Sequence, residues 1–169
     1  MEIKVKHTSE NFKTFRAEKV KSLFNAENGH TWEHTANLPI EDKGWQIGLI
    51  VGPSGSGKTS IGKQIWDSGI TNLTEGWNPS LPIIEDISPD KSMNEVTSAL
   101  SAVGLGDVPA WLRPFKVLSN GEQFRAGLAR LICEAPNKVI VDEFTSVIDR
   151  QIAKIGASAF AKAWRRTPK

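Results

Sequence analysis

Eight consecutive residues have the composition of a loop that holds phosphate groups. They match the pattern G-x-x-x-x-G-K-[ST] and read Gly52, Pro53, Ser54, Gly55, Ser56, Gly57, Lys58 and Thr59. Glycines let the backbone curl so that its N–H groups point at phosphate oxygens, and the N-terminus of the following helix favours the anion. Lys58 supplies a cation for the β- and γ-phosphates, Thr59 offers a hydroxyl to Mg²⁺, and Ser60 belongs to the same binding set. The motif predicts a site for ATP or ADP with Mg²⁺. A chance match in a glycine-rich turn is the alternative, which the flanking strand and helix patterns disfavour.

Two carboxylates end an apolar run of the sequence. Asp142 and Glu143 follow residues 139–141, Val-Ile-Val, which predict a buried strand of a parallel sheet. Ligands of an open α/β sheet bind at the carboxyl ends of its strands. We therefore expect Asp142 to hold Mg²⁺, and Glu143 and Lys58 to be catalytic, with Glu143 as the general base on the attacking water. The alternative is a strand that enters solvent with two charges, and the phosphate loop disfavours it.

A third segment distinguishes between families, because kinases and GTPases also carry the first two motifs. Residues 118–123 read Leu-Ser-Asn-Gly-Glu-Gln and precede a predicted helix. They resemble the LSGGQ signature of ABC-type (ATP-binding cassette) P-loop ATPases, from which Asn120 and the inserted Glu122 depart. Residues 144–149 resemble that family's S-A-L-D loop. The resemblance covers roughly residues 20–150.

The resemblance implies a site shared between two chains. In the family, the signature serine and glycine, here Ser119 and Gly121, face the γ-phosphate of ATP held by a second subunit, and Asp149 would lie at the dimer interface. An ordinary helix cap at Ser119 or Asn120 is compatible with this role, because a cap and an anion site use the same exposed N–H groups.

The family also stacks an aromatic ring on adenine. Phe24 fits the spacing before the loop best, and Trp32 is a second candidate. Packing of Phe24 in the core, as a strand residue, is an equally favoured alternative.

The sequence departs from the family's pattern in two ways between the phosphate loop and the signature-like segment. This segment is shorter than in transporter subunits, so the helical subdomain is reduced and the soluble branch of the family is favoured. It also contains no glutamine between Gln64 and Gln123. The family's Q-loop glutamine is therefore missing, and Glu85 or Asp86 replaces it unless this segment is a solvated loop.

A third departure concerns the C-terminal region. The sequence stops at Lys169, before the family's switch histidine, and His7, His30 and His34 all lie upstream. We expect a C-terminally truncated chain, or a natural one without the switch, in which binding of ATP survives and hydrolysis is weak.

Hydrophobic periodicity predicts the surrounding elements. Strands are expected at residues 3–5, 15–23, 33–40, 45–51, 81–84 and 139–141. Helices are expected at residues 58–66, 93–103, 121–133 and 149–164, with Asp149 as the last N-cap and a loop or helix end at 104–114. The pattern predicts an α/β P-loop NTPase with a mainly parallel sheet and flanking helices, plus an N-terminal antiparallel β subdomain and a reduced helical subdomain.

One domain is expected over residues 1–169. Its predicted parts are an antiparallel β subdomain at 1–44, the P-loop core at 45–79 and 135–169, and a helical and signature region at 80–134. Net charge is +2, Cys133 is the only cysteine, and no apolar run reaches the length of a membrane span. We expect a cytoplasmic chain without direct membrane insertion. A basic N-terminal stretch gives weak support for nucleic acid, and a solvated strand face explains it better.

The leading hypothesis is an ABC-type ATPase domain that forms a head-to-tail homodimer on ATP and drives an unidentified partner domain or protein. A non-catalytic nucleotide-dependent binding module is the first alternative, favoured by the missing glutamine and histidine and opposed by Glu143. A small-molecule P-loop kinase is the second, and it leaves residues 118–123 unexplained.

Overall fold

The computed structural model describes residues 1–26, 31–40, 44–66, 70–136, 138–146 and 148–167. The chain folds into two compact units, Met1–Asp67 and Ser68–Lys169. The phosphate loop belongs to the first unit. The paired carboxylates and the signature-like segment belong to the second.

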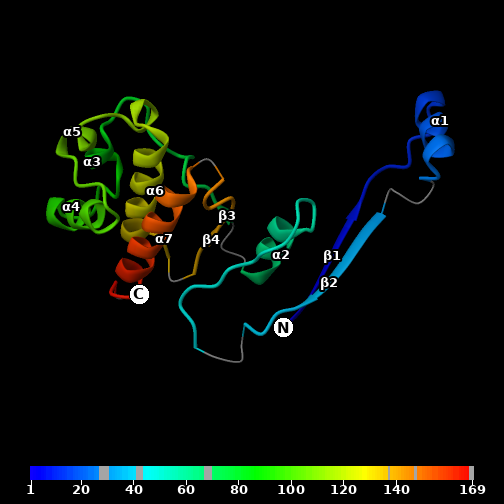
Figure 1. Cartoon of the computed structure of the whole chain (residues 1–169), viewed down its shortest axis with the longest axis horizontal. Coiled ribbons are helices and arrows are strands. Elements are labelled where there is room, and N and C mark those ends of the chain that lie inside the picture. Colours follow the sequence, from blue (N-terminus) through cyan, green and yellow to red (C-terminus); the bar gives the residue numbers. More distant parts are fainter. Residues whose placement is uncertain (27–30, 41–43, 67–69, 137, 147, 168–169) are drawn as a thin grey trace. The chain divides into compact units, whose positions relative to one another are not determined.

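An antiparallel pair of strands organises the first unit (Figure 1). Its described elements are, in chain order, β1 (Glu2–Thr8), α1 (Phe15–Phe24), β2 (Thr31–Asn37) and α2 (Lys58–Ile65). Side chains alternate between the two faces of a strand, so Ile3 and Val5 share one face of β1 and are only 2% and 3% exposed. Ile61 of α2 packs against them and completes a small core. The strands pair in register from Glu2 opposite Asn37 to Thr8 opposite Thr31.

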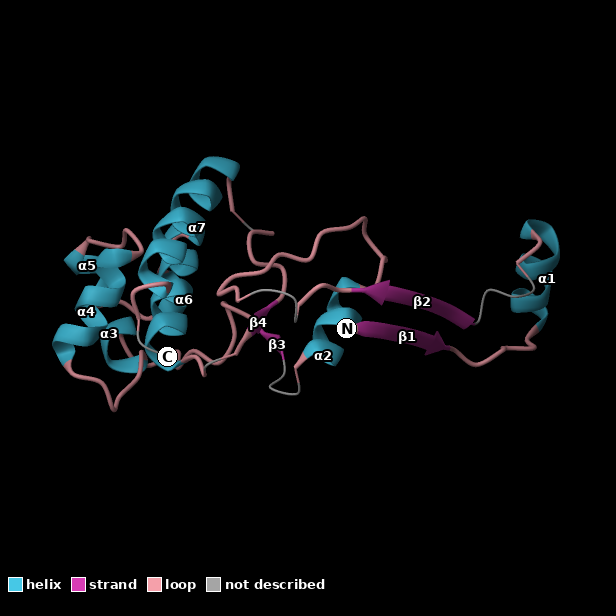
Figure 2. Cartoon of the chain, turned by 90° about the horizontal axis from the view of Figure 1, so that it is seen from below, coloured by secondary structure: helices cyan, strands magenta, loops and turns pink. Residues whose placement is uncertain are grey.

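The second unit is mainly helical (Figure 2). Its described elements are β3 (Ile70–Thr71), α3 (Ile83–Asp86), α4 (Met93–Ala102), α5 (Val108–Trp111), η1 (Phe115–Val117), α6 (Asn120–Glu134), β4 (Ile140–Val141) and α7 (Arg150–Trp164). β3 and β4 pair in parallel, with Thr71 opposite Val141.

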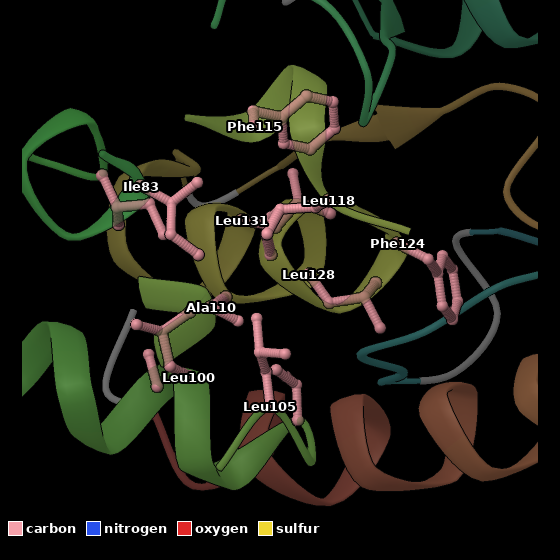
Figure 3. Packing of buried hydrophobic residues seen from close by; sticks show 14 of the residues in the cluster. Ile83, Leu100, Leu105, Ala110, Phe115, Leu118, Phe124, Leu128 and Leu131 are labelled. Carbon is pink, nitrogen blue, oxygen red and sulfur yellow. The ribbon is translucent and has the colours of Figure 1, made fainter. Parts of the chain in front are cut away.

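Helix α6 lies at the centre of the second unit's core (Figure 3). Its residues Ala126, Leu128 and Ala129 are fully buried. Leu100 of α4 and Ile83 of α3 are buried in the same cluster. Helices α4 and α6, which pack against each other, each begin with a capping box that stabilises the first turn.

Several expected elements are confirmed. The N-terminal antiparallel strands, the helix after the phosphate loop and the helix after the signature-like segment are present. The strand before Asp142 is short, and it is parallel to its neighbour as expected. Asp149 is the N-cap of α7, since its side chain accepts a hydrogen bond from the N–H of Gln151.

Three expected strands are wrong. Residues 15–23 form helix α1, because the Thr14 side chain caps its first turn and the segment is rich in helix-forming residues. Residues 81–84 enter helix α3, since Pro82 has no N–H for a strand ladder and serves as the N-cap instead. Residues 45–51 form no strand, and Leu49 and Val51 are 83% and 79% exposed. In the described first unit, the sheet consists of β1 and β2, and residues 45–51 pair with neither strand.

The parallel sheet is also smaller than expected. Among the described residues it consists of the β3–β4 pair. The region 104–114, expected as a loop or helix end, contains the short helix α5. None of the helices in the described ranges has the length and apolarity to cross a membrane.

Candidate functional site

The phosphate loop curls tightly before α2. Gly55 and Gly57 have φ angles of 76° and 79°, left-handed values that glycine adopts without a steric penalty. A Cβ added to Gly52 would lie 2.7 Å from Ser56 Oγ, so a larger residue would crowd the loop. The N–H of Ser56 donates to the carbonyl of Pro53 at 3.3 Å, which closes the turn.

Polar side chains follow the curl in the first turn of α2. The ammonium of Lys58 donates to the carbonyl oxygens of Gly52 and Pro53, at 3.1 and 2.8 Å, and is thereby fixed against the loop. Thr59 and Ser60 bring hydroxyl groups to the same turn. Backbone N–H groups, an ammonium and a hydroxyl oxygen are the donor and ligand types that a nucleotide triphosphate with Mg²⁺ requires, so this loop fits that ligand.

Aromatic rings from the strand pair lie against the loop. A Cβ added to Gly57 would lie 2.6 Å from the Trp32 ring, so the tryptophan touches the loop where α2 begins. Trp32 stacks on His7, with 5.8 Å between ring centroids, and on His34, with 5.7 Å. Nε2 of His7 also lies 2.7 Å from Oγ of Ser60. The strands and the loop are thus tied together by packing and by a hydrogen bond.

Phe24 occupies a different environment from the one expected. It is the last residue of helix α1 and is 76% exposed, so neither a strand nor core packing describes it. Helix α1 buries none of its residues and lies beyond the end of the strand pair (Figures 1 and 2). The structure brings Trp32, the second aromatic candidate, to the loop.

The two carboxylates stand directly after β4. Asp142 is half-buried, and its backbone N–H donates to the carbonyl of Thr71 on β3 at 3.2 Å. Its Oδ1 accepts the N–H of Glu143 at 3.0 Å. The strand pair therefore holds Asp142 at its carboxyl end, while the side chain of Glu143 is exposed to solvent.

The backbone of Glu143 is left-handed. Its φ of 49° is uncommon for a residue with a Cβ and costs about 1–2 kcal/mol. The carbonyl of Glu143 accepts hydrogen bonds from the N–H and the hydroxyl of Ser146, both at 3.1 Å. These bonds offset the strain and close a tight turn after the carboxylate.

The end of the neighbouring strand carries an amide side chain. Asn72 follows β3, and its Oδ1 accepts hydrogen bonds from the N–H and the hydroxyl of Thr74, at 3.0 and 2.8 Å. Glu85 and Asp86, the expected replacements for the Q-loop glutamine, lie in helix α3 instead of at a strand end. The amide beside the acidic strand end is therefore Asn72.

Ser119 is the N-cap of helix α6, which confirms the capping role and assigns it to Ser119 instead of Asn120. Its N–H and its hydroxyl both donate to Oε2 of Glu122, each at 2.7 Å. The hydroxyl bond first, and the backbone bond second, hold the pKa of Glu122 below its usual value. A Cβ added to Gly121 would lie 3.4 Å from Cδ1 of Ile152, so this glycine packs against α7.

Some residues of these sites were not singled out from the sequence. His7 and Asn72 act through contacts between segments that are distant in sequence, so no local pattern indicates them. Ser146 lies within the loop-like segment after Glu143, where the resemblance drew attention to Asp149 alone. Trp32 was named, but spacing favoured Phe24.

Comparison with curated proteins finds several relatives of this chain. No protein-family model matches the chain. A protein named "ABC transporter I family member 10" from Arabidopsis thaliana is 28% identical over 131 residues, which is 62% of this chain and 47% of that protein. "Putative 2-aminoethylphosphonate import ATP-binding protein PhnT" from Salmonella typhimurium is 29% identical over 181 residues, covering 87% of this chain and 48% of the relative.

A third relative reaches a higher identity over a smaller share. "Inner membrane ABC transporter ATP-binding protein YddA" from Escherichia coli is 33% identical over 132 residues, covering 62% of this chain and 22% of the relative. The chain spans about half the length of the first two relatives and less of the third. The first and third names contain the words "ABC transporter", and the second and third contain "ATP-binding protein".

Proposed function

Because this chain belongs to the ABC-type ATPases, we propose that it binds Mg²⁺-ATP at residues 52–60, pairs head to tail with a second copy and hydrolyses the nucleotide to drive a partner. The supporting observation is the arrangement of the phosphate loop, with its left-handed glycines and its lysine held against the curl. The named relatives are ATP-binding proteins, which agrees with this ligand.

The loop binds the triphosphate by its backbone N–H groups and the N-terminus of α2. Lys58 would exchange its bonds with the loop carbonyls for bonds to phosphate oxygens, and the hydroxyl of Thr59 would help to hold Mg²⁺. Trp32 is the aromatic residue for adenine in this account, because it touches Gly57, whereas Phe24 ends an exposed helix.

Hydrolysis depends on the two residues after β4. When bound, Mg²⁺ neutralises charge on the β- and γ-phosphates. Asp142 would be the carboxylate that helps to hold that ion, and the carboxylate of Glu143 would accept a proton from the attacking water. The exposed position of Glu143 leaves its carboxylate accessible to a water and a nucleotide.

The second copy supplies Ser119 and Gly121. The N-terminus of α6 directs N–H groups outward, which suits the γ-phosphate bound by the other chain. Glu122 now takes both donors of Ser119, so closure of the dimer requires the phosphate to replace that carboxylate.

The proposed partner is a membrane transport component. The names of the relatives, which include "import" and "inner membrane", favour a membrane transport component and a cytoplasmic location for this chain. A soluble partner is the second candidate, favoured by the short segment between Lys58 and Ser119.

The substitution Glu143→Gln tests the proposal. It removes the general base and keeps the shape, so ATP and Mg²⁺ should trap a dimer that elutes ahead of the monomer in size-exclusion chromatography. The variant Lys58→Ala, combined with Glu143→Gln, should remain monomeric. If Glu143→Gln binds ATP and stays monomeric, the head-to-tail dimer is wrong, and the nucleotide-dependent binding module or the kinase becomes the better account.

A further inference from the structure

We propose that Phe144 is a positioning residue for Glu143, because its ring ties the strained backbone of that residue to the first turns of α6. This inference rests on the proposed function only in treating Glu143 as the general base. The ring belongs to a row of four aromatic side chains that crosses the second unit: Phe124, Phe144, Phe160 and Trp164.

The row begins in α6. Phe124 is only 4% exposed and lies in the second turn of α6, five residues after the capping residue Ser119. Phe144 meets it edge to face, with ring centroids 5.5 Å apart and planes at 73°. This T-shaped geometry is a favoured arrangement of aromatic pairs.

Helix α7 holds the row from the other side. Phe160 lies 6.2 Å from the Phe144 ring and 5.4 Å from Trp164. A Cβ added to Gly156 would lie 2.5 Å from Cε1 of Phe124, so α7 approaches that ring as closely as a glycine allows. The ring of Phe124, a residue of α6, is therefore held in place by α7, and the ring of Phe144 packs against this fixed ring.

Glu143 precedes Phe144 directly in the chain, so fixing the ring of Phe144 restricts the backbone of Glu143. Glu143 has a left-handed φ of 49°, and such a conformation persists only when its surroundings impose it. On one side, Glu143 follows β4, and its N–H is held by the hydrogen bond that it donates to Oδ1 of Asp142. On the other side, Ser146 binds its carbonyl, and Phe144 anchors the next residue in the aromatic row.

The arrangement also connects two parts of the proposed site. Phe124 lies in α6 five residues after the N-cap Ser119, so a displacement of α6 moves the ring against which Phe144 packs.

Leucine substitutions at Phe144 and Phe160 form a matched test in the whole chain. Each substitution removes one ring from the same row, but only Phe144 is the covalent neighbour of Glu143 in the chain. We expect Phe144→Leu to lower kcat for ATP by about tenfold or more, with KM for ATP changed less than about twofold, because a general base is displaced while the binding loop is untouched. Phe160→Leu should keep kcat within about twofold, and Phe144→Tyr, which keeps the ring, should restore it.

Amide hydrogen exchange gives a readout that needs no turnover. Phe144→Leu should speed exchange at the N–H of Ser146, which bonds to Glu143, and leave the amide of Leu128 in α6 unchanged. Equal effects of Phe144→Leu and Phe160→Leu, or unchanged exchange at Ser146 in Phe144→Leu, would overturn the inference. If the wild-type chain binds ATP without hydrolysing it, the proposed hydrolysis fails, while exchange at Ser146 still decides the role of Phe144.

Discussion

The N–H and the hydroxyl of Ser119 both donate to one carboxylate oxygen of Glu122, each at 2.7 Å. Ser92 and Glu95 form the same capping box at the start of α4. One box lies in the proposed contact with a second copy, and the other has no such role. The chain thus contains its own control for separating helix stability from dimer formation.

Replacement of Ser119 or Ser92 by alanine should lower the free energy of unfolding by a similar amount, about 1 kcal/mol, because each removes one N-cap. Only Ser119→Ala should also reduce the ATP-dependent dimer in the Glu143→Gln background. Denaturant unfolding and size-exclusion chromatography measure the two effects. A loss of dimer in both serine variants would mean that stability alone explains it.

Acid should weaken the α4 capping box in a defined range of pH. Hydrogen bonds from the N–H and hydroxyl of Ser92, with the nearby Lys91, lower the pKa of Glu95 from 4.5 to about 2. A lowered folded-state pKa means that this stabilisation is present above pH 4.5 and is lost as the pH falls towards 2. Glu95→Gln should therefore be less stable than wild type at neutral pH, and the difference should shrink across that range in denaturant titrations. A constant difference would contradict this.

Gly127 should tolerate no side chain. A Cβ there would lie 2.8 Å from Cβ of Leu73 and 2.9 Å from its carbonyl oxygen, in the buried part of α6. Gly127→Ala should destabilise the chain by about 1–3 kcal/mol through overpacking. Gly106 has no atom within 4 Å of an added Cβ, so Gly106→Ala should change stability by about 0.5 kcal/mol or less. Thermal unfolding of both variants checks the contrast, and equal melting temperatures would refute the packing of Gly127.

The two aromatic candidates for adenine should behave differently. Trp32→Leu should weaken ATP binding by about three- to tenfold, which corresponds to the loss of one aromatic stacking contact. Phe24→Leu should leave the affinity unchanged, since Phe24 ends an exposed helix. Titration with a fluorescent ATP analogue measures both. Weaker binding in Phe24→Leu alone would return the role to Phe24.

The sequence predicted local features better than pairings. Residues 120–134 and 150–164 form helices because each has a capping residue and an apolar face, and both signals are local. Residues 15–23 and 81–84 were mistaken for strands, since short apolar runs fit either structure. The Thr14 cap favours the helix in the first segment, and the missing N–H of Pro82 disfavours a strand in the second.

In the candidate site, too, the sequence indicated motifs of adjacent residues but not contacts between distant segments. The phosphate loop and the acidic strand end follow contiguous motifs, so the sequence alone indicated them. The contact of Trp32 with Gly57 and the pairing of Phe124 with Phe144 join segments that are far apart in the chain. Such contacts depend on tertiary packing, which periodicity does not describe.

Complementation between two inactive variants tests the central claim most directly. Lys58→Ala disables the loop, and Ser119→Ala disables the signature-like segment. A head-to-tail dimer of the two variants contains one intact site, made from the Ser119→Ala loop and the Lys58→Ala signature. We therefore predict that the mixture hydrolyses ATP faster than either variant alone at the same total concentration. A mixture no more active than the mean of its components would contradict a site shared between two copies.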